Sequence, residues 1–213
     1  MGDNGKDVAM KKILLAGITA VMLTVGMSGV ASAITIFSDN FESDTVGLNK
    51  TNFYNWTISD GTVDLIGTGT SWDWFPANGK YVDMDGSSMN AGKMLSTGAL
   101  NLSAGDYTLQ FDLAGNQRAN TGELVTVMVN NGISSQSYSL GATAPFQTFT
   151  NFFTLSGTTA VSLSFEGIGG DNIGMLLDNV RLEQVNAVPE PSTLLLLGSG
   201  LLGFVALNRR RKT

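Results

Sequence analysis

Carboxylates, amides, hydroxyls and aromatic rings carry whatever chemistry this chain performs, because its 213 residues include no His and no Cys. Without these two residue types there is no disulfide framework, no thiolate nucleophile, no Ser-His-Asp triad and no His-ligated metal. A glycosidase needs only two carboxylates about 5–10 Å apart. The sequence singles out no such pair among its 18 Asp and Glu residues, so we expect a protein that is not an enzyme.

Two tryptophans, Trp72 and Trp74, lie two residues apart in a stretch rich in Gly, Ser and Thr. Sugars present C–H faces that can stack on indole rings, and residues i and i+2 face the same way when the backbone is extended. The pair therefore predicts an aromatic platform for a carbohydrate. The alternative is that one or both rings close the end of the core. Trp56 lies within a strand pattern, and we expect it to pack in the core.

A polar run, Asn116-Gln117-Arg118-Ala119-Asn120, directly follows a strongly patterned strand. Its amides and its guanidinium are hydrogen-bond donors suited to hydroxyl or carboxylate groups. Asn116, Arg118 and Asn120 are therefore further candidates for carbohydrate binding. The alternative is an ordinary solvated hairpin.

The segments that must position these residues alternate between apolar and polar side chains. The alternation is clearest at residues 107–113 and 161–165, and it recurs at 34–37, 56–58, 62–66, 81–84, 124–129, 146–153 and 176–185. Such alternation is typical of half-buried strands, and turn signals such as Asn78-Gly79 and Asn131-Gly132 separate the segments. We find no convincing helical stripe here. The pattern predicts an all-β domain over residues 34–187, an antiparallel β-sandwich and most simply a jelly roll.

This middle region is strongly acidic. Residues 34–190 contain five Lys and Arg residues against sixteen Asp and Glu, a formal net charge of −11. Nucleic acid and anionic lipid are thereby disfavoured as partners, because phosphate binding needs clustered cations. A metal cation or a neutral sugar remains compatible with this charge.

The N-terminus has the three parts of a secretory signal peptide over residues 1–33. Lys11 and Lys12 precede an apolar stretch at 13–25, and Ala31-Ser32-Ala33 forms a small-residue cleavage site. We expect signal peptidase to cleave after Ala33. Residues 1–9 form a polar extension, which a start at Met10 would explain.

The C-terminus, residues 188–213, is built from three consecutive parts. Pro189, Glu190 and Pro191 come first, an uncharged stretch at 192–207 follows, and the end carries Arg209, Arg210, Arg211 and Lys212. Sixteen helical residues span about 24 Å, enough for a marginal single transmembrane helix. Under the positive-inside rule the basic residues at both ends stay cytoplasmic, so the domain between them lies outside the inner membrane.

These three parts, in this order, resemble the PEP-CTERM sorting signal of Gram-negative bacteria. The resemblance implies an inner-membrane precursor that an exosortase recognises and cleaves near the motif. The domain is then transferred to the cell surface or extracellular matrix, in bacteria that make exopolysaccharide and biofilm. The alternative is an ordinary C-terminal anchor.

The middle region resembles the galactose-binding-like jelly rolls, which include families of carbohydrate-binding modules. The resemblance rests on diffuse motifs, among them Asp39-Asn40-Phe41-Glu42, Tyr81-Val82-Asp83-Met84-Asp85 and Leu177-Asp178-Asn179-Val180. It implies a structural Ca²⁺ that joins the first strand to the last through Glu42 and Asp178. The alternative is that these two are hydrogen-bonding residues at strand ends. Asp83 and Asp85, followed by Gly86, are a second candidate cluster for calcium, but we expect solvated carboxylates in a turn there.

These observations together predict a secreted, non-catalytic protein whose jelly roll binds extracellular polysaccharide. Two alternatives remain open. One is a structural or adhesive surface protein without a ligand site, and the other is a hydrolase or lyase that acts on glycans.

Overall fold

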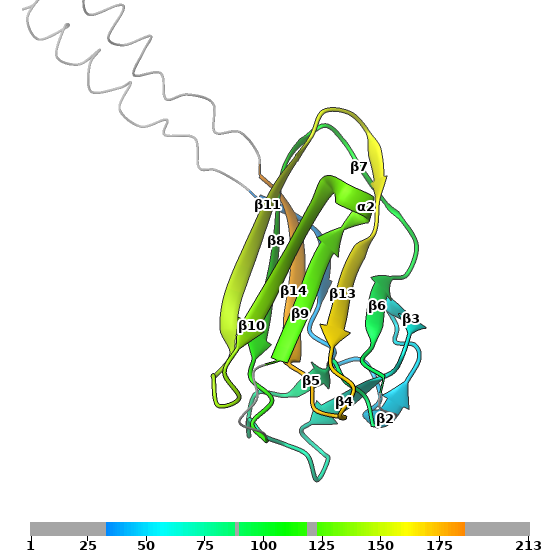
Figure 1. Ribbon diagram of the computed structural model, residues 1–213. Helices are drawn as coiled ribbons and strands as arrows, with labels where there is room; N and C mark the ends of the chain where they lie inside the picture. The colour runs from blue at the N-terminus through cyan, green and yellow to red at the C-terminus, as the bar shows by residue number, and fades with distance from the viewer. Residues whose placement is uncertain (1–32, 88–89, 119–122, 186–213) are drawn as a thin grey trace, which may run out of the picture. The chain divides into compact units, whose positions relative to one another are not determined.

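The computed structural model describes residues 33–87, 90–118 and 123–185, and every structural statement below concerns these residues. They form strands β1 to β14 and one helical turn, arranged as two facing antiparallel sheets (Figure 1). None of the helices among the described residues has the length and apolar character needed to span a membrane. The expected signal peptide, the membrane segment at 192–207 and the sorting residues lie outside the described residues.

The larger sheet has seven strands in the order β11-β8-β14-β5-β4-β2, and β1 also pairs with β14. The first and last strands of the domain are therefore neighbours. The members of this sheet are β1 (Ala33–Asp39), β2 (Gly47–Lys50), β4 (Val63–Gly67), β5 (Lys80–Asp83), β8 (Gly105–Ala114), β11 (Gln147–Leu155) and β14 (Leu176–Val185).

The smaller sheet has five strands in the order β10-β9-β13-β6-β3, and β12 pairs with β7 in a separate ladder. A single turn of helix, α2 (Asn130–Ile133), joins β9 to β10. The remaining strands are β3 (Trp56–Asp60), β6 (Lys93–Ser96), β7 (Leu100–Leu102), β9 (Glu123–Val129), β10 (Ser134–Leu140), β12 (Thr159–Val161) and β13 (Leu163–Ile168).

The core fills the space between the two sheets. In β8 every second side chain is buried, and Phe111 meets Phe165 of the opposite sheet edge to face at 5.3 Å between ring centroids. Trp56 is fully buried, packs against Phe37 and Phe165, and donates its indole N–H to Asp39 at 2.9 Å. The predicted sandwich and the predicted core position of Trp56 are both confirmed.

The alternation pattern missed five strands: β2, β6, β7, β10 and β12. β10 is an edge strand with the sequence Ser-Ser-Gln-Ser-Tyr-Ser-Leu, and only Tyr138 and Leu140 of this strand pack against the core cluster. An edge strand with so few buried side chains has too few apolar residues for the pattern to register. The other four have only three or four residues each.

A second, smaller apolar cluster lies outside the sandwich core. Ile66 and Tyr81 are paired across β4 and β5, and Ala114 and Leu176 are paired across β8 and β14. Trp74, Phe75 and Phe146 pack against these four residues. This cluster anchors the loop between β4 and β5 to the larger sheet.

Candidate functional site

The β4–β5 loop, residues 68–79, holds both candidate tryptophans. Its base is closed by a hydrogen bond from Thr68 N to Gly79 O at 2.9 Å. Gly67 has a φ of +103°, and a Cβ there would lie 2.3 Å from Gly79 O, so this position requires glycine. The Tyr81 hydroxyl accepts the amide hydrogens of Trp74 and Phe75, at 2.6 and 3.1 Å, and fixes the far half of the loop.

Trp72 lines a surface groove in this loop. The groove has a volume of about 300 Å³, and the side chain of Trp72 is 43% exposed. All eight lining residues are uncharged: Val46, Gly47, Leu48, Leu65, Gly69, Thr70, Ser71 and Trp72. A large exposed ring beside hydroxyl groups in an uncharged groove can stack on a sugar face and bind its hydroxyls.

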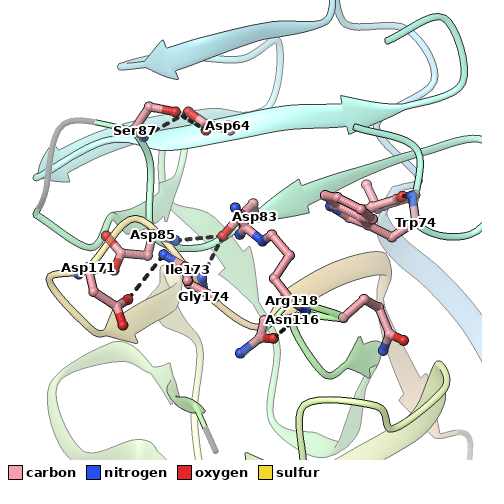
Figure 2. A network of polar contacts seen from close by, with 12 residues as sticks. Asp64, Trp74, Asp83, Asp85, Ser87, Asn116, Arg118, Asp171, Ile173 and Gly174 are labelled. Carbon is pink, nitrogen blue, oxygen red and sulfur yellow. Dashed lines mark hydrogen bonds and ion pairs between the residues drawn. The ribbon is translucent and has the colours of Figure 1, made fainter. Parts of the chain in front are cut away.

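Trp74 has a different environment from Trp72. It packs against the second apolar cluster, and its ring centroid lies 6.0 Å from the Arg118 guanidinium carbon. Figure 2 shows Arg118 reaching from the segment after β8 to Asp83 on β5, where the two side chains form an ion pair. The structure therefore joins Trp74 to Arg118, while Trp72 lines a separate groove.

Asn116 belongs to the same network as Arg118. Its side chain is fully buried, and its Oδ1 accepts the backbone N–H of Arg118 at 2.8 Å. This contact shapes the turn that presents Arg118. Asn120 lies outside the described residues.

The expectation that Asp83 and Asp85 are solvated carboxylates is wrong. Both are 1% exposed. Asp83 Oδ1 accepts the N–H groups of Asp85 and Gly174 (Figure 2). Asp85 Oδ2 accepts those of Gly170 and Asp171. The carboxylates are buried because the segment before β14 folds over them, a long-range contact that the local sequence does not encode.

Burial raises the pKa of Asp83 to about 7, even though the Arg118 charge lowers it. The charge on Asp64 adds a smaller upward contribution. Desolvation disfavours the ionised form of a carboxyl, so the ion pair with Arg118 only partly offsets the cost of burying Asp83.

Glu42 and Asp178, the candidate calcium ligands, lie near each other at the end of the larger sheet. Burial raises the pKa of Asp178 to about 7, and the charges of Asp112 and Glu42 add to that rise. Asp178 is 3% exposed and accepts hydrogen bonds from Asn78 Nδ2 and Asn179 N, at 3.0 and 2.7 Å.

A cation already lies beside Glu42. Lys80 N donates to Glu42 Oε1 at 2.6 Å, and Lys80 Nζ donates to the backbone carbonyls of Glu42 and Asp44, both at 2.7 Å. The Lys80 ammonium thus occupies these two carbonyl oxygens, and a Ca²⁺ ion would have to displace it to use them as ligands. The described residues contain no group of three or more Asp, Glu, His and Cys side chains that could hold a metal ion. Carbonyl groups and water would have to complete the shell of any metal at Glu42 and Asp178.

Sequence reasoning missed Asn78 and Lys80. Asn78-Gly79 is recognisable as a turn, but nothing in the sequence indicates that Asn78 binds Asp178, one hundred residues away. Gly79 has a φ of +90°, a backbone conformation that favours glycine, and a Cβ there would also lie 2.0 Å from Glu42 Oε1.

Comparison with protein families identifies one motif. Residues 187–212 match the PEP-CTERM protein-sorting motif. No curated protein matches the chain.

Several solved structures are similar to this chain. The CBM22-1 xylan-binding domain of Paenibacillus barcinonensis Xyn10C has 13% identity and a TM-score of 0.48, and the match covers 74% of this chain and 99% of that domain. The CBM22-1-CBM22-2 tandem of the same protein has 15% identity and a TM-score of 0.47, and the match covers 77% of this chain and 48% of the tandem. The CBM6cm-2 module of Cellvibrio mixtus lichenase 5A has 16% identity and a TM-score of 0.41, with 72% and 100% covered. This chain therefore spans about half the length of the tandem.

Proposed function

We propose that this protein is exported, sorted to the cell surface through its C-terminal motif, and binds a neutral polysaccharide without catalysis. The PEP-CTERM protein-sorting motif supports the route, with signal peptidase and an exosortase as processing partners. The observation that carries the binding proposal is Trp72, which is exposed in an uncharged groove of about 300 Å³.

The chemistry of the groove favours a neutral sugar. Trp72 supplies a stacking surface, and Ser71 supplies a hydroxyl at its side. The Thr70 hydroxyl donates to Gly67 O and accepts the Trp72 N–H, so it shapes the loop. The strongly acidic domain around the groove repels polyanions, so uronic-acid-rich polymers are poor ligands. Trp74 and Arg118 stabilise the loop from the other side, through the contact with Asp83.

Equilibrium binding to neutral polysaccharides tests the proposal, with full-length protein in mild detergent. Xylan and cello-oligosaccharides, which the names of the similar structures suggest, are the first ligands to try. Trp72→Ala should weaken binding about tenfold or more, which corresponds to about 1.4 kcal/mol. Tyr54→Ala is the matched control, since Tyr54 is an 81% exposed aromatic outside the groove. Equal losses in both variants, or shortening of the polymer during the assay, would contradict the proposal.

We also propose that Glu42 and Asp178 hold a structural Ca²⁺. A bound cation would offset the cost of keeping the buried Asp178 carboxylate ionised and would stabilise only the folded domain. The two carboxylates are hard oxygen ligands of the kind that this ion prefers. Ligation by the carbonyls of residues 42 and 44 would require displacement of the Lys80 ammonium that they bind.

A further inference from the structure

The outer face of the larger sheet carries a row of side chains that the groove does not use. In β11 the side chains of Phe149, Phe153 and Leu155 pack in the core. Because side chains alternate between the faces of a strand, Thr148 and Phe152 point to the outside. The same alternation turns the polar residues of β8 outward beside them.

A depression of about 290 Å³ lies on this face. Its lining comes from β1 and the residue after it, and from β8, β11 and β14. It consists entirely of polar and charged residues: Ser38, Asp39, Asn40, Gln110, Asp112, Thr148, Asn179 and Arg181. Four strands that are neighbours in the sheet thus build one site, and its position is fixed by their hydrogen-bonded registers.

The charged groups of the depression are held in place. Asp112 accepts hydrogen bonds from the Thr148 hydroxyl at 2.6 Å and from Asn179 Nδ2 at 2.9 Å. Asn179 has a φ of +50° and lies at a register shift between β14 and β8. Bulges of this kind redirect a side chain. Here the bulge brings the amide of Asn179 to Asp112.

The pairing of these charges argues against an ionic ligand. Arg181 forms an ion pair with Glu183 and donates to Thr35 Oγ1. Asp39 is 8% exposed, and its carboxylate accepts hydrogen bonds from Trp56, Asn55 and the amide of Phe41. The guanidinium is therefore already neutralised, and the carboxylates already have donors.

Neutral hydrogen-bonding groups remain available. Within the described residues the side chains of Gln110 and Ser38 have no hydrogen-bond partner, although both line the depression. An amide with two donors and an acceptor, next to a hydroxyl, suits the alternating donors and acceptors of a sugar. These two groups favour a neutral, hydroxyl-rich ligand.

An exposed aromatic ring continues the site along the strands. Phe152 is 74% exposed and lies opposite Thr108, one row beyond the pair formed by Thr150 and Gln110. Two residues along an antiparallel strand cover about 7 Å. A polysaccharide chain can therefore stack on Phe152 and reach Gln110 at the same time.

We infer that the outer face of the larger sheet is a second binding site for neutral glycan, formed by Phe152 and the depression around Gln110 and Asp112. The inference extends the proposed function, because it assigns the same ligand class to a second surface. Two sites on one domain let a long polymer bind more tightly than a short oligosaccharide through avidity.

The test compares single and double variants of the full-length protein in mild detergent, by equilibrium binding to long neutral polysaccharides such as xylan. Phe152→Ala and Gln110→Glu should each weaken binding several-fold. Either change combined with Trp72→Ala should weaken it by roughly a further tenfold beyond Trp72→Ala alone. Tyr54→Ala, which removes an equally exposed ring elsewhere, should change nothing.

The failure of this inference is distinguishable from failure of the proposed function. Suppose that Trp72→Ala weakens binding, while Phe152→Ala and Gln110→Glu leave it unchanged both in the wild type and in the Trp72→Ala protein. The groove is then still supported as a binding site, and the second site is overturned. Wild-type protein that binds no neutral polysaccharide overturns both. Gln110→Glu keeps the size of the side chain, so its melting temperature separates lost binding from lost folding.

Discussion

Trp56 and Trp72 place the same side chain in two opposite environments. Trp56 lies between the sheets with none of its surface exposed, surrounded by Phe37, Phe41 and Phe165. Trp72 lies in the β4–β5 loop, 43% exposed in an uncharged groove. Only the buried ring has a role that folding alone explains. The contrast separates the part of the domain that makes the fold from the part available to a ligand.

The largest expected effect on stability comes from removing the buried ring of Trp56. Trp56→Ala should lower the free energy of unfolding by about 3–5 kcal/mol, because it leaves a large cavity. It also removes the indole donor of the buried Asp39 carboxylate. Denaturant unfolding measures the loss. A loss below about 1 kcal/mol would contradict the assignment of Trp56 to the core.

Calcium should give the next largest effect, at the end of the sheet near the loop. Ca²⁺ at one hundred times its dissociation constant should stabilise the domain by about 2.7 kcal/mol, seen as a higher melting temperature than in chelator. Glu42→Ala and Asp178→Ala should remove that difference. Asp60→Asn, an exposed carboxylate elsewhere, is the control and should keep it. A wild-type melting temperature that is indifferent to chelator would refute the site.

A smaller effect should follow from pH in the presence of chelator. The folded-state pKa values of Asp83 and Asp178 are both raised to about 7 by burial. The unfolded chain titrates near the ordinary Asp value of about 3.9, so the folded state holds these protons more tightly. The contribution to stability is therefore full below the unfolded pKa and is lost as pH rises through about 7.

Lowering the pH from 7 to 6 should thus raise the free energy of unfolding by roughly 2 kcal/mol, about 1 kcal/mol for each group, measured by denaturant titration. Asp83→Asn should reduce this slope, because one of the two titrating groups is gone. A stability that falls steadily over the same range would contradict the pKa directions.

The smallest stability effect belongs to the loop. Trp72→Ala should change the free energy of unfolding by no more than about 0.5 kcal/mol, as expected for a side chain outside the packed core. Thermal unfolding beside Trp56→Ala makes the comparison direct. A loss of 2 kcal/mol or more would mean that Trp72 is a structural residue.

The sequence predicted those features that depend on local pattern. Alternation identified β8 and the burial of Trp56, because each strand contributes its own apolar face. It failed where partners come from distant segments. Asp83 is buried by contacts with Gly174 and Arg118, and Asp178 is bound by Asn78. The separation of Trp72 from Trp74 likewise depends on the second apolar cluster, which draws residues from four strands.

Affinity electrophoresis tests the central claim most directly. Full-length wild-type, Trp72→Ala and Tyr54→Ala proteins are run in mild detergent through gels with and without a neutral polysaccharide such as xylan. Binding at the groove predicts that the polysaccharide retards the wild-type and Tyr54→Ala proteins, while Trp72→Ala migrates nearly as in the plain gel. Equal retardation of all three proteins, or of none across a panel of neutral polysaccharides, would contradict it.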